Sequence, residues 1–222
     1  MSGPRPSCCY DDAFDRKYAE RQLRDYRQKG PGRTTRALAA ALAPRGDAIG
    51  MTVLDVGGGV GGLHHLLMDA GARSATDVDA SRPYIAAARA EAERRGIADR
   101  VSFVAGDFAE VAPSVEGADL VGLDRVVCCY ADADRLVAAA ARHTRRRLGI
   151  VVPKDGRLAE AIVWVLNRGE WLARSSFRMH AHRHERIVTA ARREGLEPAG
   201  TRSLGVWQLL VFERPILTAG TR

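Results

Sequence analysis

The chain has 222 residues, of which 46% are hydrophobic and 27% charged, and its formal net charge is +7 at neutral pH. This length is typical of one globular domain with some additions and is enough to bury a core without disulfides or a structural metal. No run of about 18 apolar residues is present, which argues against a transmembrane helix. The N-terminus also lacks the layout of a signal peptide, so we expect a cytoplasmic protein.

The positive charge comes almost entirely from arginine, which is spread along the whole chain. A basic balance suits nucleic acid or anionic substrates, but scattered arginines are also an ordinary solvated surface. The one run of three, residues 145–147, is expected to end a helix, where cations favour the negative terminus. The four cysteines form two adjacent pairs, Cys8-Cys9 and Cys128-Cys129, without the spacing of a zinc site. We expect neither a metal site nor a nucleic-acid partner.

Residues 1–48 are predicted to form an N-terminal helical lid. Apolar and charged positions alternate over residues 11–42 and are interrupted at Gly30-Pro31-Gly32, which indicates two helices. Thr34 or Thr35 is a candidate cap for the second helix.

From residue 49 onward, strands and helices alternate. We predict strands at 51–56, 75–78, 101–105, 118–123 and 148–152, with helices between them and again over 157–173 and 184–194. Two late strands, at 199–204 and 206–213, are close enough for a hairpin. This alternation is typical of an α/β fold with a mostly parallel sheet covered by helices on both faces. Residues 49–222 are therefore predicted to be one domain, with a substrate-recognition insertion at about 154–184.

A glycine-rich loop follows the first predicted strand. Asp55, Gly57, Gly59 and Gly61 fit the pattern D-x-G-x-G-x-G. Glycines let the backbone turn tightly and approach a ligand, and the start of the next helix offers free amides. Alone, this loop is equally compatible with the pyrophosphate of NAD in a Rossmann fold.

Acids at successive strand ends favour S-adenosylmethionine (SAM) over a dinucleotide. Asp55 lies inside the loop, where a carboxylate would repel a pyrophosphate but suits a cationic amino group. Asp79, followed by Ala80, ends the second strand, where an acid can accept both ribose hydroxyls, as it also does in NAD enzymes. Asp107 and Phe108 follow the third strand, placed for the adenine amino group and ring. In open α/β sheets, ligands bind beyond these carboxyl ends.

Taken together, the segments VLDVGGGVGG, DVDAS, VSFVAGDF and ADLVGLDRV resemble class I SAM-dependent methyltransferases. The resemblance covers about residues 48–213. It implies SAM as cofactor and a Rossmann-like, seven-stranded sheet that ends in a reversed antiparallel hairpin. A weaker resemblance, to magnesium-protoporphyrin O-methyltransferases, is carried by residues 123–126, LGIVVPKD, the helix with Trp164 and Trp171, and residues 174–177. It places Arg33 in a lid over the cofactor.

Three residues are candidates for the acceptor side of the site. Methyl transfer is an in-line displacement, so an enzyme mainly aligns and desolvates the two reactants. Asp124 ends the fourth strand, beside the methyl position in the resembled family, where it either orients substrate, cofactor or lid or caps the following turn. Arg125 suits an anionic substrate, and Tyr130 is expected to line the site.

The histidines and the cysteine pairs leave alternatives open. His64 and His65 open the helix after the glycine loop, and either one faces the cofactor or both lie on the helix surface. His180, His182 and His184 share a face in extended form, which favours a solvated or substrate-facing loop over a metal site. The two cysteine pairs either meet at the mouth of the pocket, as a site for a soft metal or arsenic, or have no joint role.

The sequence thus predicts SAM-dependent methyl transfer to a small-molecule acceptor, at an oxygen, nitrogen or sulfur atom, a carboxylate included. A nucleic-acid methyltransferase is an alternative, although residues 123–126 lack the Asn/Asp-Pro-Pro-Tyr run of amino-directed enzymes. A non-catalytic SAM-binding regulator is another. An NAD-dependent oxidoreductase is disfavoured by Asp55. The chain is expected to be a monomer or a homodimer.

Overall fold

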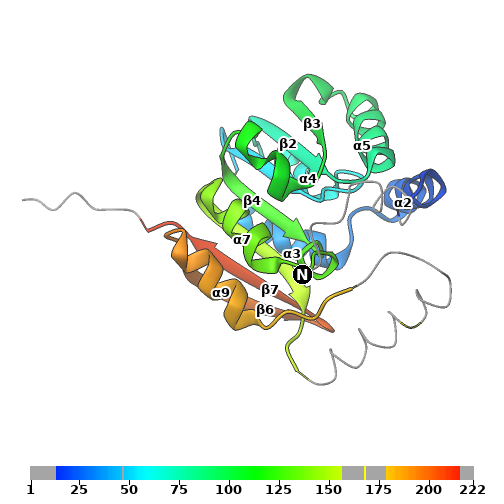
Figure 1. Ribbon diagram of the computed structural model, residues 1–222. Coiled ribbons are helices and arrows are strands. Elements are labelled where there is room, and N and C mark those ends of the chain that lie inside the picture. The colour runs from blue at the N-terminus through cyan, green and yellow to red at the C-terminus, as the bar shows by residue number, and fades with distance from the viewer. Residues whose placement is uncertain (1–13, 47, 157–167, 169–178, 216–222) are drawn as a thin grey trace, which may run out of the picture.

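The computed structural model describes residues 14–46, 48–156, 168 and 179–215, and it contains a seven-stranded sheet in the order β3-β2-β1-β4-β5-β7-β6 (Figure 1). The strands are β1 Thr52–Val56, β2 Ser74–Asp79, β3 Val101–Ala105, β4 Ala118–Asp124, β5 Thr144–Pro153, β6 Glu197–Leu204 and β7 Trp207–Glu213. The pairings among β1 to β5 are parallel, and β7 runs antiparallel to both β5 and β6. The predicted α/β class and the C-terminal antiparallel hairpin are therefore confirmed.

Helices bury both faces of the sheet, as its apolar strands require. One core cluster joins the sheet to α3, α4 and α5, and the other joins it to α6, α7 and α9. The helices are α2 Arg16–Lys29, α3 Arg33–Leu42, α4 Gly62–Asp69, α5 Arg82–Arg94, α6 Phe108–Val111, α7 Ala133–Arg142 and α9 His184–Arg193, with short 3₁₀ turns η1 Pro44–Gly46, η2 Ala98–Arg100, η3 Ala112–Ser114 and η4 Val127–Cys129. None of the helices in these described ranges is long and apolar enough to cross a membrane.

The two N-terminal helices pack in different ways. Leu38 and Leu42 of α3 are fully buried against β4 and β5, where Gly122 and Gly149 leave the space that their side chains fill. By contrast, α2 lies outside this core and is tied to α5 by an ion pair between Arg27 Nε and Glu91 Oε2, 2.8 Å apart. The segment predicted as one lid thus consists of a core helix and a peripheral helix.

Two local predictions are wrong. Helix α7 ends at Arg142 with His143 as its C-cap, so the arginines at 145–147 belong to β5 and not to a helix terminus. This part of β5 pairs with β4 at Thr144 and Arg147, and Arg147 also pairs with Glu213 of β7, with an Nε–Oε1 distance of 2.6 Å. Gly32 is the N-cap of α3 and makes no side-chain cap bond. Thr34 and Thr35 therefore lie inside the first turn, where their hydroxyls face another partner.

Candidate active site

A cavity of about 720 Å³ opens at the carboxyl ends of β1, β2 and β4. Its volume falls within the range of small-molecule sites, roughly 300–1,000 Å³. The sheet order reverses between β1 and β4, and this switch point is where open α/β sheets bind ligands. The glycine loop, the strand ends and the N-terminal helices α2 and α3 all contribute to the lining.

The glycine loop has a backbone that only glycine adopts freely. Gly57, Gly59 and Gly61 have φ angles of 68°, 60° and 88°, in the left-handed region. Gly61 is the N-cap of α4, and a Cβ there would come within 2.7 Å of the His64 ring. The D-x-G-x-G-x-G spacing therefore reflects three backbone positions that tolerate no side chain without strain.

Asp79 and Asp107 are held by backbone amides at the cavity wall. Asp79 accepts from Gly59 N at 3.0 Å and from Ser81 N at 2.8 Å, which joins the end of β2 to the glycine loop. Asp107 accepts from Ala109 N at 2.9 Å and from the Tyr130 hydroxyl at 3.0 Å. Tyr130, which follows β4, is thus tied to the acid that follows β3.

The two histidines of α4 are core residues, not surface residues. Asp55 Oδ2 accepts from His64 N at 3.2 Å and lies 3.0 Å from His64 Nδ1. His65 is 1% exposed, and its Nδ1 lies 2.9 Å from the hydroxyl of Tyr26 on α2. Burial, helped by the neighbouring His64, lowers the pKa of His65 to about 3, so this ring is neutral at physiological pH. A chain of contacts therefore runs from Asp55 to α2.

Asp77 is a candidate that sequence reasoning missed. It lies opposite Asp55 in the β1–β2 register, is fully buried, and has no side-chain hydrogen-bond partner among the described residues. Burial raises its pKa well above the usual value, and the charges of Asp55 and Asp79 raise it further, against the opposing effect of the Gly58 backbone amide. The available signal was an acid two residues before Asp79, because such positions share a strand face.

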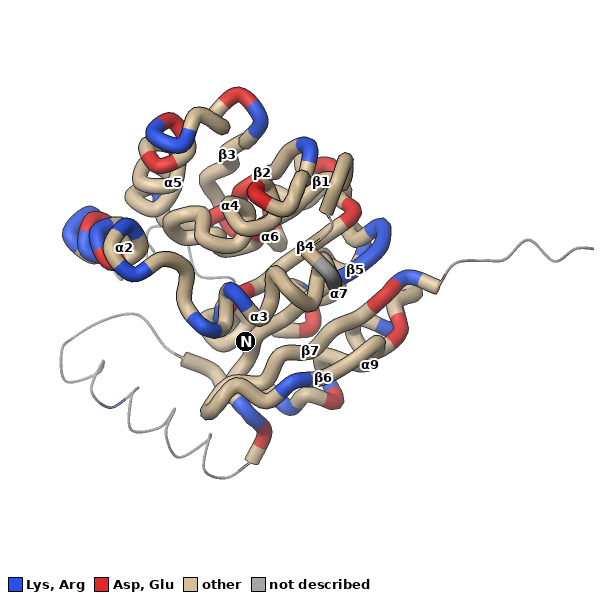
Figure 2. Tube along the Cα trace, turned by 180° about the vertical axis from the view of Figure 1, so that it is seen from behind, with Lys and Arg blue, Asp and Glu red and all other residues tan. Residues whose placement is uncertain are grey.

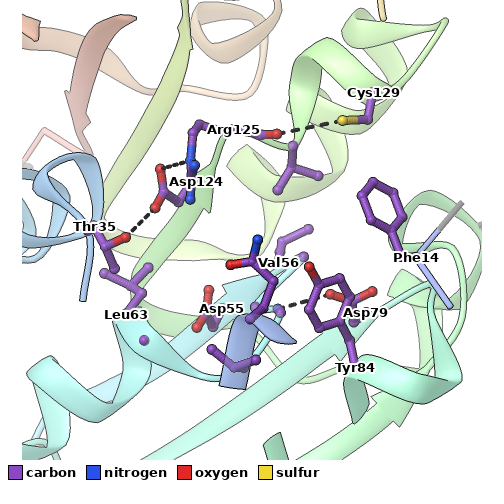
Figure 3. Close-up of a pocket in the computed structure, with 18 of the residues that line it drawn as sticks. Phe14, Thr35, Asp55, Val56, Leu63, Asp79, Tyr84, Asp124, Arg125 and Cys129 are labelled. Atoms are coloured by element: carbon purple, nitrogen blue, oxygen red, sulfur yellow. Dashed lines mark hydrogen bonds and ion pairs between the residues drawn. The ribbon is translucent and has the colours of Figure 1, made fainter. Parts of the chain in front are cut away.

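On the opposite wall, Asp124 connects β4 to α3. Thr35 Oγ1 donates to Asp124 Oδ2 at 2.6 Å, and Arg125 Nε lies 3.3 Å from Oδ1 (Figure 3). Arg125 has a φ of 63° and is the one non-glycine residue with positive φ in the described chain. This conformation costs roughly 1–2 kcal/mol. Strain of this kind concentrates at functional sites.

The turn after Arg125 brings two thiols to the cavity. Cys128 Sγ and Cys129 Sγ are 3.9 Å apart, and both contact the Arg125 carbonyl oxygen. A hydrogen bond from Cys129 lowers the pKa of the Cys128 thiol against the opposing effect of burial. Cys8 and Cys9 lie outside the described residues, so the predicted meeting of the two pairs is not addressed. Within the described ranges, no three His, Cys, Asp or Glu residues are grouped as a metal site.

The alternating histidines connect their segment to the η4 turn and to the end of β5. His182 Nε2 lies 2.8 Å from Tyr130 O, and His184 Nε2 lies 2.9 Å from Pro153 O. His180 N donates to Cys128 O at 2.7 Å. Most of the predicted insertion at 154–184, including Trp164, Trp171 and Phe177, lies outside the described residues.

The structure brings most of the predicted site residues together. The cavity is lined by Asp55, Gly57, Gly59, Asp79, Ala80, Asp107, Phe108, Asp124, Arg125 and Tyr130. Gly61 caps α4 just beyond this lining. Arg33 is exposed and lies outside it, whereas Arg36, three residues later on α3, lines the cavity. The separation arises because α3 begins at Arg33, which faces solvent, while the next two residues turn toward the sheet.

Comparison with known proteins supplies the class. Residues 53–147 match the family model of a methyltransferase domain. No protein of curated function matches the chain by sequence. Among solved structures, the magnesium protoporphyrin IX methyltransferase of Synechocystis PCC 6803 with bound S-adenosylhomocysteine (SAH) is similar, with 23% identity and a TM-score of 0.72, over 94% of this chain and 99% of that one. The putative methyltransferase in complex with the Trm112 activator of Haloferax volcanii is 21% identical, with a TM-score of 0.69, over 94% and 99% of the two chains.

A third neighbour is an O-methyltransferase family protein from Burkholderia thailandensis. It is 19% identical with a TM-score of 0.71, over 93% of this chain and 61% of that one. At these identities the neighbours establish the shared fold. Residues 53–147 therefore match a methyltransferase domain, and the chain as a whole has the fold of these methyltransferases.

The geometry of the cavity fits SAM, the cofactor that the sequence predicts. A Cβ at Gly58 would come within 3.0 Å of Asp55 Oδ2 and 2.9 Å of Asp77 Cγ, so the loop backbone lies flush against the acids with no side chain between. Carboxylates at three strand ends suit a ligand that carries two positive charges and a ribose diol. A dinucleotide pyrophosphate would meet repulsion at the same place.

Proposed function

We propose that this protein transfers the methyl group of SAM to a small-molecule acceptor. The observation that supports this most is the continuity of the cavity, which extends from Asp55 and Asp79 to Arg125 and Tyr130. One end suits the cofactor, and the other is left for a second molecule of modest size. The bound cofactor would supply an electrophilic methyl group, and the chain would supply alignment and exclusion of water.

On the cofactor side, we assign roles by chemistry. Asp79 would accept from the ribose hydroxyls, and Asp107 and Phe108 would contact the adenine. Asp55 and the glycine loop suit the ammonium group. Arg36 and the uncapped N-terminus of α3 suit the carboxylate, because helix N-termini favour anions.

On the acceptor side, Arg125 is the residue best placed to select the substrate. Its guanidinium is half-exposed at the cavity wall, and the strained backbone directs it there. An anionic acceptor, such as a carboxylate, needs no strong general base. The Asp124 carboxylate accepts from both Thr35 and Arg125, so it would act as a positioning residue for both.

Residues 1–48 would supply the cover of the site, mainly through α2. Phe14, Tyr18 and Tyr26 of this region line the cavity, and Tyr18 meets Tyr84 of α5 edge to face, with ring centroids 6.3 Å apart. The contact between Tyr26 and His65 ties the same helix to the start of α4. This arrangement would close the cofactor end against water.

The charge distribution favours a small molecule over nucleic acid. Lys and Arg are interspersed with Asp and Glu along α2, α5 and α9 (Figure 2). Nucleic-acid enzymes commonly present a basic stripe that tracks the phosphate backbone. A steep fall of binding with salt would be expected only for the nucleic-acid alternative.

The test is a transfer assay with methyl-labelled SAM, offered in parallel to a small-molecule extract, total RNA and DNA. We expect label in the small-molecule fraction with the wild type and none with Asp79→Ala. Label in RNA or DNA would establish the nucleic-acid alternative instead. SAM binding without SAH formation in any fraction would indicate a non-catalytic regulator.

A further inference from the structure

The buried carboxyl group of Asp77 has no part in the assignments above. Its neighbours in the sheet are Asp55 on β1 and Phe103 on β3, and Asp79 follows two residues later on the same strand face. Both of its oxygens are sealed from solvent and lack a side-chain partner in the described part of the chain, so that the backbone amide of Gly58 is the donor that faces them. Buried polar groups are nearly always fully paired, so a core carboxyl group without a side-chain donor calls for a specific explanation.

Asp77 lies directly beneath the cofactor loop. A Cβ placed on Gly58 would approach the Asp77 carboxyl group more closely than atoms can, with Cγ at 2.9 Å. Only the glycine backbone therefore separates this carboxyl group from the cavity. Glycine is therefore needed at residue 58 for a second reason besides loop conformation, because a side chain there would collide with Asp77.

The groups that face Asp77 make its charge costly before the cofactor arrives. Asp55 and Asp79 are like charges on the same face, while the guanidinium of Arg89 is occupied over the Phe103 ring, 4.8 Å from its centroid. His64 serves Asp55, which it contacts through both its backbone N and Nδ1. An isolated buried carboxylate is avoided by protonation. The direction of the Asp77 pKa agrees with this geometry.

We infer that Asp77 is protonated in the cofactor-free protein and releases its proton to solvent when SAM binds, so that a carboxylate under the loop matches the charge of the cofactor. SAM carries a sulfonium and an ammonium group, and either one brings positive charge to the cavity above Gly58. Binding then exchanges a proton for a cationic ligand. This inference rests on the cofactor and not on the identity of the acceptor.

Two consequences follow from linkage between the two equilibria. The affinity for SAM rises as the pH rises, because less protonated Asp77 has to be ionised. Loss of the carboxylate charge lowers the affinity for SAM at slightly alkaline pH roughly tenfold, the size of one charge–charge interaction across several ångströms of partly shielded protein. The affinity for a neutral nucleoside without the methionine chain does not depend on the charge of Asp77.

The experiment is titration calorimetry in buffers of different ionisation heat, which counts the protons released per ligand bound. The ligands are SAM and 5′-deoxy-5′-methylthioadenosine, which keeps the nucleoside but carries neither positive charge. The proteins are the wild type, Asp77→Asn, which mimics the protonated acid, and Asp99→Asn, a control at an exposed acid outside the cavity. No acceptor is needed, so the outcome does not depend on the proposed substrate class.

We expect the wild type and Asp99→Asn to release about half a proton or more per SAM near neutral pH. Asp77→Asn should release none, and neither should the neutral nucleoside in any of the three proteins. Equal release by wild type and Asp77→Asn, or by SAM and the neutral nucleoside, would overturn the inference. Asp77→Ser provides a second uncharged variant, and thermal unfolding of each protein verifies that the fold is kept.

Discussion

The two ends of the cavity are built differently. At the cofactor end, Asp55 and Asp79 are buried at the ends of central strands, and backbone amides or His64 fix their carboxylates. At the acceptor end, Arg125 is half-exposed in a strained turn, and the surrounding wall comes from connecting segments and the N-terminal helices. In the proposed function, the rigid strand ends would hold the cofactor. Loops and appended helices, which tolerate change, carry what distinguishes this protein.

The largest effect should come from a change confined to the cofactor end. Gly58→Val places a branched side chain where Asp77 and Asp55 already lie, so we expect SAH affinity to fall more than about 100-fold. Calorimetry with SAH measures it. The double variant Gly58→Val, Asp77→Ala should recover part of the affinity, because the colliding carboxyl group is gone. If the single variant bound SAH normally, the contact between loop and acid would not matter.

The second prediction separates the stability of the cofactor end from its binding role. The pKa of His65 is about 3 in the folded protein and 6.5 for a free histidine. As the pH falls through 6.5, the unfolded chain therefore binds a proton at His65 and the folded chain does not. Stability therefore falls as the pH drops below about 6.5, by about 2 kcal/mol at pH 5. Denaturant unfolding at pH 7 and pH 5 tests this, and His65→Asn should lose less over the same interval.

The third prediction addresses the acceptor end. Arg125→Met removes the guanidinium and keeps the length of the side chain, so KM for an anionic acceptor should rise about tenfold, the value of one charge-assisted hydrogen bond. SAH affinity should stay within twofold or so of the wild type, since the cofactor end is untouched. Steady-state kinetics and calorimetry check both. An equal loss of SAH affinity would show that the two ends are not separate.

The smallest effect concerns the link between α3 and β4. Thr35→Val removes the hydroxyl that donates to Asp124 at 2.6 Å and keeps the side-chain shape. We expect kcat/KM to fall about fivefold, equivalent to about 1 kcal/mol for one hydrogen bond to a charged group. Thr35→Ser, which retains the hydroxyl, should restore most of the activity. Failure of the serine variant to recover would point to packing as the cause.

The sequence predicted those parts of the site that depend on local pattern. The glycine loop and the acids at 55, 79 and 107 could be predicted because they lie at the ends of apolar strands. The length of such a strand and the turn residues after it can be recognised in the sequence. Asp77 was missed because its significance depends on lying opposite Asp55 in the register, which no single strand reveals. The burial of His64 and the start of β5 at Thr144 are likewise set by distant partners. Thr35 was likewise predicted to be a helix cap because its partner, Asp124, is distant in the sequence.

The close packing of Leu38 and Leu42 against Gly122 and Gly149 makes the two N-terminal helices unequal in the cost of moving them. Moving α3 would expose these two leucines, at a cost of about 1.5–3 kcal/mol each. Moving α2 would uncover Ala19, its one buried residue, together with a few polar contacts. Gly30, with a φ of 73°, lies between the two helices and can absorb the rotation. Of the two N-terminal helices, α2 is thus the one that can leave the cavity wall at the smaller cost in buried apolar surface.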